Sequence, residues 1–208
     1  SMSQGGSVGK QNVTTGERWY IKPPTIDINV KLRFNWNSAI AQDPFDTKTV
    51  YYGSQFLHKS TNKGAAWSTI SPDLTMNNPE QQRQDETGGL TLDITGAETF
   101  NTIITIAPSA KQSGVIWVGT DDGNVQLTTD GGKTWTNFRG KIPGMPIGAW
   151  VPQIQASRHS AGEAFVVAND YRRGDFKTYV FRTTDFGKTW TRLLDETKVR
   201  GYALCVLQ

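Results

Sequence analysis

An eight-residue pattern that occurs three times constrains this chain more than any other feature of its sequence. It reads Thr-Thr-Asp-Gly-Gly-Lys-Thr-Trp at 128–135, Thr-Thr-Asp-Phe-Gly-Lys-Thr-Trp at 183–190 and, in degenerate form, Ser-Thr-Asn-Lys-Gly-Ala-Ala-Trp at 60–67. Each copy lies between two short runs rich in β-branched and aromatic residues. The repeat therefore indicates an architecture assembled from copies of one supersecondary unit.

The residue types in the pattern are those of a tight turn between antiparallel strands. Gly132 can supply a positive φ, the Asp130 carboxylate can accept hydrogen bonds from turn amides, and Trp135 can bury a large ring beside the turn. The first copy departs at Asn62 and Ala66, so we expect its turn to be held less well. The predicted structural residues are Ser60, Asn62, Gly64, Trp67, Thr128, Asp130, Gly132, Trp135, Thr183, Asp185, Gly187 and Trp190.

Strand-like runs recur in the same order around each copy, which predicts an all-β chain of four-stranded antiparallel meanders. These meanders occupy about 37–75, 100–140 and 150–195, and 201–208 looks like the first strand of a further one. Before them, 1–10 reads as a tag remnant and linker, and 11–36 as an extended segment, with strands at 18–21 and 30–34, that could belong to a preceding unit. Repeats of this length predict β-propeller blades, here an incomplete ring of about three blades plus one extra strand.

Composition excludes several classes of function. The 22 Lys and Arg residues are scattered among 19 Asp and Glu, which gives no nucleic-acid footprint, and no run of about 18 apolar residues could span a membrane. The single Cys205 lies in an apolar run and is expected to be buried, without a His partner for nucleophilic catalysis. His58 and His159 are isolated, so the sequence predicts neither a metal nor a cofactor.

The pattern Ser/Thr-x-Asp-x-Gly-x-Thr-Trp resembles the Asp-box of the BNR-repeat propellers, where it is a folding element. Further runs at 34–37, 43–53, 70–75 and 117–125 are similar to bacterial secreted proteins with a sortilin-type propeller, often labelled glycosyl hydrolases. The resemblance covers about residues 30–208 and implies an extracytoplasmic location. The resemblance identifies no catalytic residues in this chain. The Arg-Ile-Pro signature and the arginine trio of sialidases are missing from the sequence, which disfavours a sialidase.

Blade topology places any functional site on the loops opposite the Asp-box turns. Among these loops, Asp121 and Asp122 are weak catalytic candidates, since two adjacent carboxylates could serve acid/base chemistry, although Asp-Asp-Gly-Asn also suits a hairpin turn. The binding candidates are Trp36, Asn37, Trp150, Asp170, Tyr171, Arg172 and Arg173. The tryptophans could stack on sugars or pack between blades, and 170–173 could grip a carboxylate or sugar or form a solvated hairpin tip.

The composition of segment 77–95 predicts a solvent-exposed loop. Its Asp85, Glu86 and Asp93 are further carboxylates that a glycosidase could use, but nothing in the sequence identifies two of them as a catalytic pair. Two functions fit this sequence. The main prediction is a non-catalytic Asp-box propeller module that binds protein, peptide or glycan, and the alternative is a glycoside hydrolase that uses paired carboxylates on the same face.

Three blades and one strand cannot close a ring, because propellers use roughly four to eight blades. We therefore expect either part of a larger propeller or association between chains, with 202–207 pairing onto another chain or packing against the open blade edge. The start at 1–7 looks like a tag remnant, so a native signal peptide could have been removed.

Overall fold

The computed structural model describes residues 2–36, 38–83, 86 and 99–208. The chain divides into two compact units, Ser1–Ile103 and Ile104–Gln208. Each unit is built from antiparallel sheets with short connections, apart from a few 3₁₀ turns.

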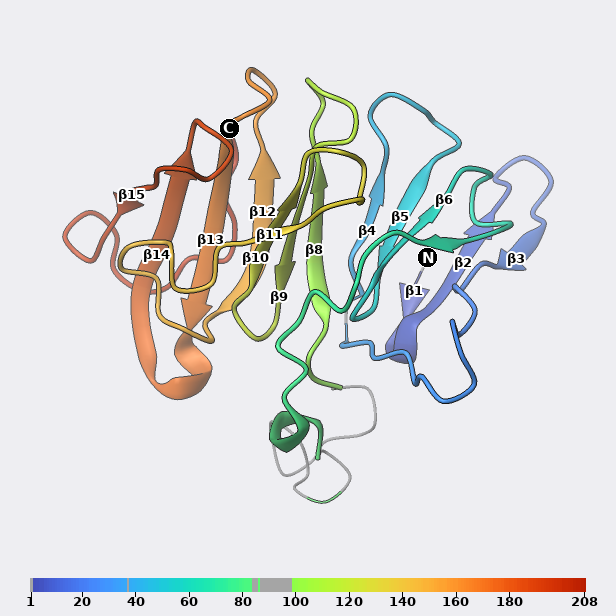
Figure 1. The fold of residues 1–208 in the computed structure, drawn as a ribbon, viewed down its shortest axis with the longest axis horizontal. Coiled ribbons are helices and arrows are strands. Elements are labelled where there is room, and N and C mark those ends of the chain that lie inside the picture. The colour runs from blue at the N-terminus through green and yellow to red at the C-terminus, as the bar shows by residue number, and fades with distance from the viewer. Residues whose placement is uncertain (1, 37, 84–85, 87–98) are drawn as a thin grey trace. The chain divides into compact units, whose positions relative to one another are not determined.

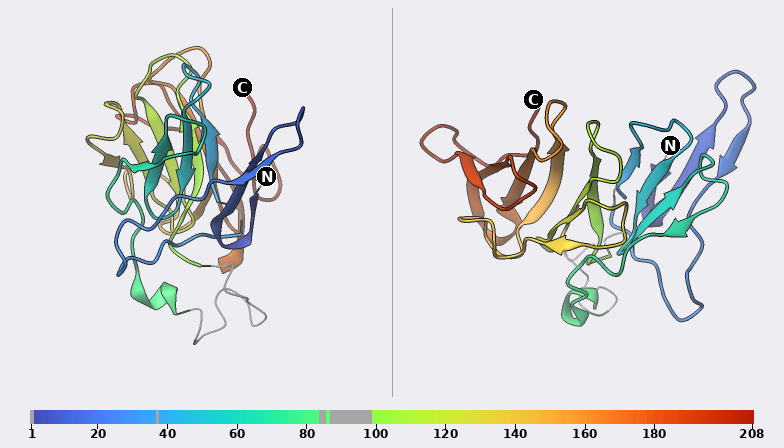
Figure 2. Two further views of the ribbon diagram at one scale, coloured as in Figure 1. Left: turned by 90° about the vertical axis from the view of Figure 1, so that its right-hand side faces the viewer. Right: turned by 45° about the horizontal axis from the view of Figure 1, so that its top comes forward.

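Unit 1 contains two antiparallel sheets (Figure 1). The first has three strands in chain order: β1 (Met2–Ser3), β2 (Ser7–Gln11) and β3 (Arg18–Tyr20), with the 3₁₀ turn η1 (Gln4–Gly6) between β1 and β2. The second has four: β4 (Ile40–Gln42), β5 (Val50–Gly53), β6 (Leu57–Ser60) and β7 (Ser68–Thr69), followed by η2 (Pro79–Gln82). The β2–β3 hairpin projects from the rest of this unit (Figure 2).

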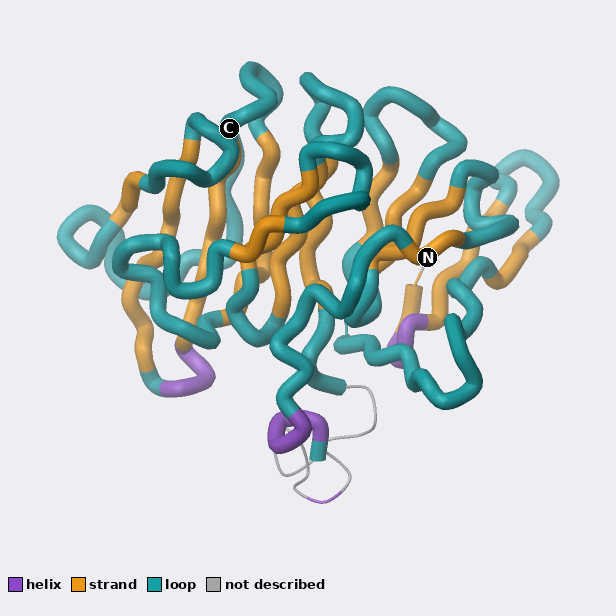
Figure 3. Tube along the Cα trace, in the orientation of Figure 1, coloured by secondary structure: helices purple, strands orange, loops and turns teal. Residues whose placement is uncertain are grey.

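Unit 2 contains two four-stranded antiparallel sheets, again in chain order. One sheet consists of β8 (Ile103–Pro108), whose first residue belongs to unit 1, β9 (Ile116–Thr120), β10 (Val125–Thr128) and β11 (Thr136–Asn137). The other consists of β12 (Trp150–Ala156), β13 (Ala164–Asp170), η3 (Tyr171–Arg173), β14 (Asp175–Thr183) and β15 (Thr191–Leu194). The three predicted meanders are confirmed, and the all-β chain is made of β-propeller blades (Figure 3).

A glycine at the end of the second strand lies in close contact with a neighbouring side chain in two of the blades. In β9, a Cβ on Gly119 would lie 2.6 Å from side-chain carbons of Thr105 and Val151, where β12 packs against β9. Gly53 occupies the matching place in β5, and a Cβ there would lie 2.8 Å from Ile103. Both positions are therefore closed to larger residues by packing.

The core of unit 2 is organised around Trp117 in β9, which is fully buried. Its ring lies 5.8 Å from Phe138 and 6.0 Å from Trp190, the latter edge-on. Trp190 belongs to the third copy of the eight-residue repeat, at 183–190, whereas Trp117 and Phe138 belong to the preceding blade. The box tryptophan thus joins two blades instead of only closing its own turn.

The N-terminal segment differs from the expectation of a linker followed by two strands. Ser7–Gln11 forms β2, because it pairs with β3 and buries Val8 at 2% exposure in a cluster with Ile21 and Phe34. The predicted strand at 30–34 is absent among the described residues. Instead, Gln55 caps this segment through its side chain: Oε1 accepts from Arg33 N at 2.8 Å, and Nε2 donates to Lys31 O at 3.0 Å.

The C-terminal segment 201–208 forms no strand, contrary to the prediction. Two backbone amides of this segment donate to glutamine side chains of β12. Val206 N donates to Gln153 Oε1 at 2.6 Å, and Gln208 N donates to Gln155 Oε1 at 3.3 Å. The tail therefore packs on its own blade without a backbone ladder. Cys205, expected to be buried, is exposed for the same reason.

Candidate functional site

The turns formed by the three copies of the eight-residue repeat, called boxes below, are held by hydrogen bonds to the side chain at their third position. Asp130 Oδ1 accepts from the amides of Lys133 and Thr134, both at 3.0 Å, and Oδ2 accepts from Thr134 Oγ1 at 2.6 Å. These bonds, led by that of the Thr134 hydroxyl, hold the pKa of Asp130 far below its usual value. Both carboxylate oxygens accept hydrogen bonds from the turn itself, so Asp130 stabilises the turn and is not available to contact a substrate.

The third copy repeats this arrangement, and the first lacks one bond of it. Asp185 accepts from the amide and hydroxyl of Thr189 at 2.9 and 2.6 Å. In the first copy Asn62 Oδ1 accepts from the amide of Ala66 at 2.8 Å and from Ser60 Oγ at 2.9 Å. The bond from a hydroxyl at position 66 is missing, because alanine has none. The boxes lie between the third and fourth strands, so the loop after the second strand opens at the opposite end of the same blade.

In the last blade that opposite end carries a cluster of stacked side chains. The Arg172 guanidinium carbon lies 3.4 Å from the centroid of the Trp150 ring and 4.4 Å from that of Tyr171. Tyr171 stacks on Tyr202 with centroids 4.6 Å apart and a 26° interplanar angle, and Phe176 lies 6.4 Å from Tyr202. We call these five residues the aromatic platform.

An ion pair fixes the loop that carries the platform. Arg173 Nε and Nη2 donate to the two Asp170 oxygens at 2.6 and 2.8 Å, and Nη2 also donates to Ile147 O at 2.8 Å. The Asp170 side chain is only 10% exposed, and its hydrogen bond raises the pKa of Arg173. Gly174, at a φ of 80°, then turns the chain from η3 into β14. Asp170 and Arg173 therefore position Tyr171 and Arg172.

A second carboxylate holds the first residues of β14. Tyr179 Oη donates to Asp175 Oδ2 at 2.7 Å, and this bond lowers the pKa of Asp175. Burial, together with the same bond, raises the pKa of Tyr179 to about 12. The loop is thus tied down on both sides of η3, as a preformed binding surface requires.

The platform presents apolar ring surface beside a cation. Phe176 is 59% exposed and Tyr202 39% exposed, whereas one face of Trp150 is covered by Arg172. Tyrosine and tryptophan rings combine apolar faces with polar edges, so such surfaces suit ligands that are apolar on one face and hydroxylated at the rim. The open rings are Phe176 and Tyr202, not the tryptophan that the sequence favours.

Of the binding candidates taken from the sequence, the structure brings together Trp150 and 170–173. Trp36 lies in unit 1 and is 41% exposed, and its amide donates to Asn35 Oδ1 at 2.7 Å. Asn37 lies outside the described residues, as do Asp85 and Asp93. Glu86 pairs with Arg83. The sequence-based prediction did not include Phe176 and Tyr202. Both are aromatic residues in or beside predicted loops, and that pattern could have marked them as binding candidates.

The two weak catalytic candidates lie in a tight turn. Asp121 and Asp122 are 1% and 2% exposed, and Asp122 Oδ1 accepts from Thr120 Oγ1 at 2.5 Å. Thr120 N donates to Asn124 O at 3.1 Å, and Gly123 has a φ of 89°. This is the geometry of a hairpin turn, and burial leaves both carboxylates with little access to solvent.

Within the described residues no group of three or more His, Cys, Asp or Glu side chains is arranged to hold a metal ion. Within the same residues, no helix has the length and apolar character needed to cross a bilayer.

No family model matches the chain. An oligoxyloglucan-reducing end-specific xyloglucanase of Emericella nidulans is 33% identical over 92 residues, which cover 44% of this chain and 11% of that protein. A xyloglucanase of a Paenibacillus species is 33% identical over 115 residues, which cover 51% of this chain and 10% of that protein. The chain thus spans about a tenth of the length of the curated relatives it matches.

Two solved structures show weaker likeness. YCF48 from Cyanidioschyzon merolae has a TM-score of 0.49 at 14% identity, over 81% of this chain and 42% of that one. The GH74 enzyme of Niastella koreensis has a TM-score of 0.48 at 14% identity, over 93% of this chain and 30% of that one. The sortilin-type likeness noted from the sequence stays a prediction.

Proposed function

We propose that this chain is part of a glycoside hydrolase-type propeller and that its aromatic platform binds a plant β-glucan of the xyloglucan kind. The observation that carries the proposal is the continuous stack from Trp150 through Arg172 and Tyr171 to Tyr202, with Phe176 beside it. The partial matches to two xyloglucanases support the polysaccharide as ligand. They favour the glycosidase alternative over a purely non-catalytic module.

The platform acts in this proposal as a recognition surface. A pyranose ring packs its apolar face on Phe176 and Tyr202, and its rim hydroxyls lie toward the Arg172 side chain. Arg172 is held between two rings, so little side-chain entropy is lost when it meets the ligand. Asp121 and Asp122 support the adjacent turn, and a catalytic pair is not assigned to them.

Affinity electrophoresis and calorimetry on xyloglucan, with mannan as a comparison polysaccharide, test the proposal. Tyr202→Ala and Phe176→Ala should each weaken binding about tenfold, the expected result of removing one stacking ring. Phe45→Ala is the matched control, since Phe45 is 54% exposed and lies in unit 1. Unchanged affinity in both platform variants would refute the assignment of the site.

The same preparations separate binding from hydrolysis. Reducing ends released from xyloglucan are measured for the unmodified chain and for the double variant Asp121→Asn, Asp122→Asn. Release that disappears only in the double variant would overturn the structural role given to this pair. Release that both proteins show would place the catalytic acids elsewhere in the chain.

A further inference from the structure

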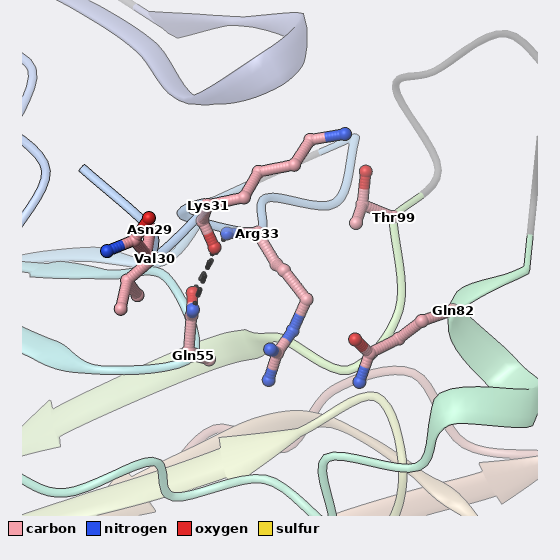
Figure 4. Close-up of a pocket in the computed structure, with 7 residues that line it drawn as sticks. All are labelled: Asn29, Val30, Lys31, Arg33, Gln55, Gln82 and Thr99. Atoms are coloured by element: carbon pink, nitrogen blue, oxygen red, sulfur yellow. Dashed lines mark hydrogen bonds between the residues drawn. The ribbon is translucent and has the colours of Figure 1, made fainter. Parts of the chain in front are cut away.

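A polar pocket of about 330 Å³ lies in unit 1, and none of its lining residues belongs to the platform (Figure 4). Its walls come from the 29–33 segment, from Gln55 in the β5–β6 turn, from Gln82 at the end of η2, and from Thr99. The β5–β6 turn follows the second strand of its blade, so the pocket opens at the end opposite the Asp-box turn 60–67. Its volume is at the lower end of ligand pockets, about 300–1,000 Å³.

Buried polar groups hold the walls of the pocket. Arg33 Nη2 donates to Asp73 Oδ2 at 2.7 Å and to Thr75 Oγ1 at 3.1 Å, while its Nε donates to Asn101 O at 3.0 Å. The Arg33 side chain is only 11% exposed. On the opposite wall, Gln82 Nε2 donates to Asn101 Oδ1 at 3.0 Å. These bonds fix both side chains before any ligand arrives.

The charges that line the pocket are positive. Lys31 and Arg33 are the ionisable lining residues, and Asp73 neutralises Arg33 through their ion pair. In the part of the chain that the structure describes, no carboxylate forms an ion pair with Lys31, whose side chain lies at one end of the pocket (Figure 4). Among the described residues, the lining therefore carries one positive charge without an ion-pair partner, which suits a singly charged anion.

The remaining lining groups suit hydroxyls. Because the Gln82 amide nitrogen is engaged within the protein, its carbonyl oxygen is the group left to accept from a ligand, and Figure 4 shows it facing Arg33 across the pocket. In the same view the Thr99 hydroxyl points toward the Lys31 end of the pocket. No aromatic residue lines this pocket among the described residues, so recognition here depends on hydrogen bonds and charge and not on stacking.

From this combination we infer that the pocket binds a uronic acid unit of an acidic polysaccharide. The carboxylate pairs with Lys31, and ring hydroxyls lie against the Gln82 carbonyl oxygen. This site shares no residue with the aromatic platform, and it takes an acidic sugar where the platform takes a neutral one. Neither site needs the other in order to bind.

Titration with glucuronic and galacturonic acid at low salt, followed by calorimetry and by the side-chain amide signals of Gln55 and Gln82 in NMR, tests the inference. Uronic acids should bind and shift both amide signals, and glucose should bind at least about tenfold more weakly because it lacks the charge. Lys31→Gln should weaken uronic acid binding about tenfold, and Lys31→Arg should retain most of it.

Lys111→Gln is the matched control, because Lys111 is an exposed lysine of unit 2 whose loss changes the net charge equally. Equal affinity of Lys31→Gln and Lys111→Gln for uronic acids would overturn the inference. So would glucose binding as tightly as the acids, or acetate and a peptide carboxylate binding as tightly as the uronic acids. If Tyr202→Ala loses xyloglucan binding but keeps uronic acid binding, the two sites bind their ligands independently.

Discussion

Acidification should destabilise unit 1 through His58. The residue is 1% exposed, its Nε2 lies 2.8 Å from Ser54 Oγ, and its Nδ1 lies 3.1 Å from Thr69 Oγ1. Within the described residues no carboxylate pairs with the ring to stabilise a positive charge. Burial therefore lowers the pKa of His58 from 6.5 to about 4.

The unfolded chain takes up the proton first, since its histidine titrates near 6.5. The stability linked to His58 is thus fully present above about pH 6.5 and is lost progressively as the pH falls toward 4. Each pH unit between the two pKa values changes the free energy of unfolding by about 1.4 kcal/mol, so roughly 3 kcal/mol is lost at the acidic end. That is a large share of the roughly 5–15 kcal/mol that holds a domain folded.

Urea unfolding of the natural chain and of His58→Gln, followed by tryptophan fluorescence between about pH 7.5 and 5, measures this loss. Glutamine keeps a donor and an acceptor but does not titrate. Over this range the natural chain should lose about 2 kcal/mol more than the variant. The chain has two histidines, so NMR can follow His58 directly. Equal losses in the two proteins, or a His58 signal titrating near 6.5, would refute the reasoning.

Three further predictions concern packing and association. Asn62→Asp with Ala66→Thr should complete the first Asp-box and raise the free energy of unfolding of unit 1 by about 1 kcal/mol, whereas Asn62→Asp with Ala66→Val should not. Gly123→Ala should cost unit 2 about 2 kcal/mol or more in thermal or urea unfolding, because its Cβ would lie 2.8 Å from the Gly148 backbone; Gly131→Ala, with open space around its Cβ, should cost less. If the segment 201–208 joins chains, light scattering will give an oligomer that its deletion converts to a monomer, and a monodisperse monomer from the full chain would contradict this.

Blade order could be predicted from sequence because it is a local property. The strands of each blade follow one another, and a clamp such as that of Asp130 joins residues no more than four apart. In the first box the sequence predicts even the loss of a single hydrogen bond, because Ala66 lacks the hydroxyl that would donate it.

The platform could be predicted only in part, because its members come from separate segments. Trp150 and 170–173 are close because β12 pairs with β13, so blade topology alone brings them together. Tyr202 joins them through a tail whose path depends on side chains such as Gln153. Likewise, no local preference makes Ser7–Gln11 a strand; its pairing with β3 and the burial of Val8 do so.

Two of the three repeat tryptophans bear on the order in which the chain can fold as it is synthesised. Trp67 Nε1 donates to Ile21 O at 2.7 Å, and Trp190 lies 5.7 Å from Phe138, so each ring reaches a residue that precedes its own blade. When such a tryptophan leaves the ribosome, its docking site has already been made. The blades that carry Trp67 and Trp190 can then each fold onto segments that have already been synthesised, without waiting for the end of the chain.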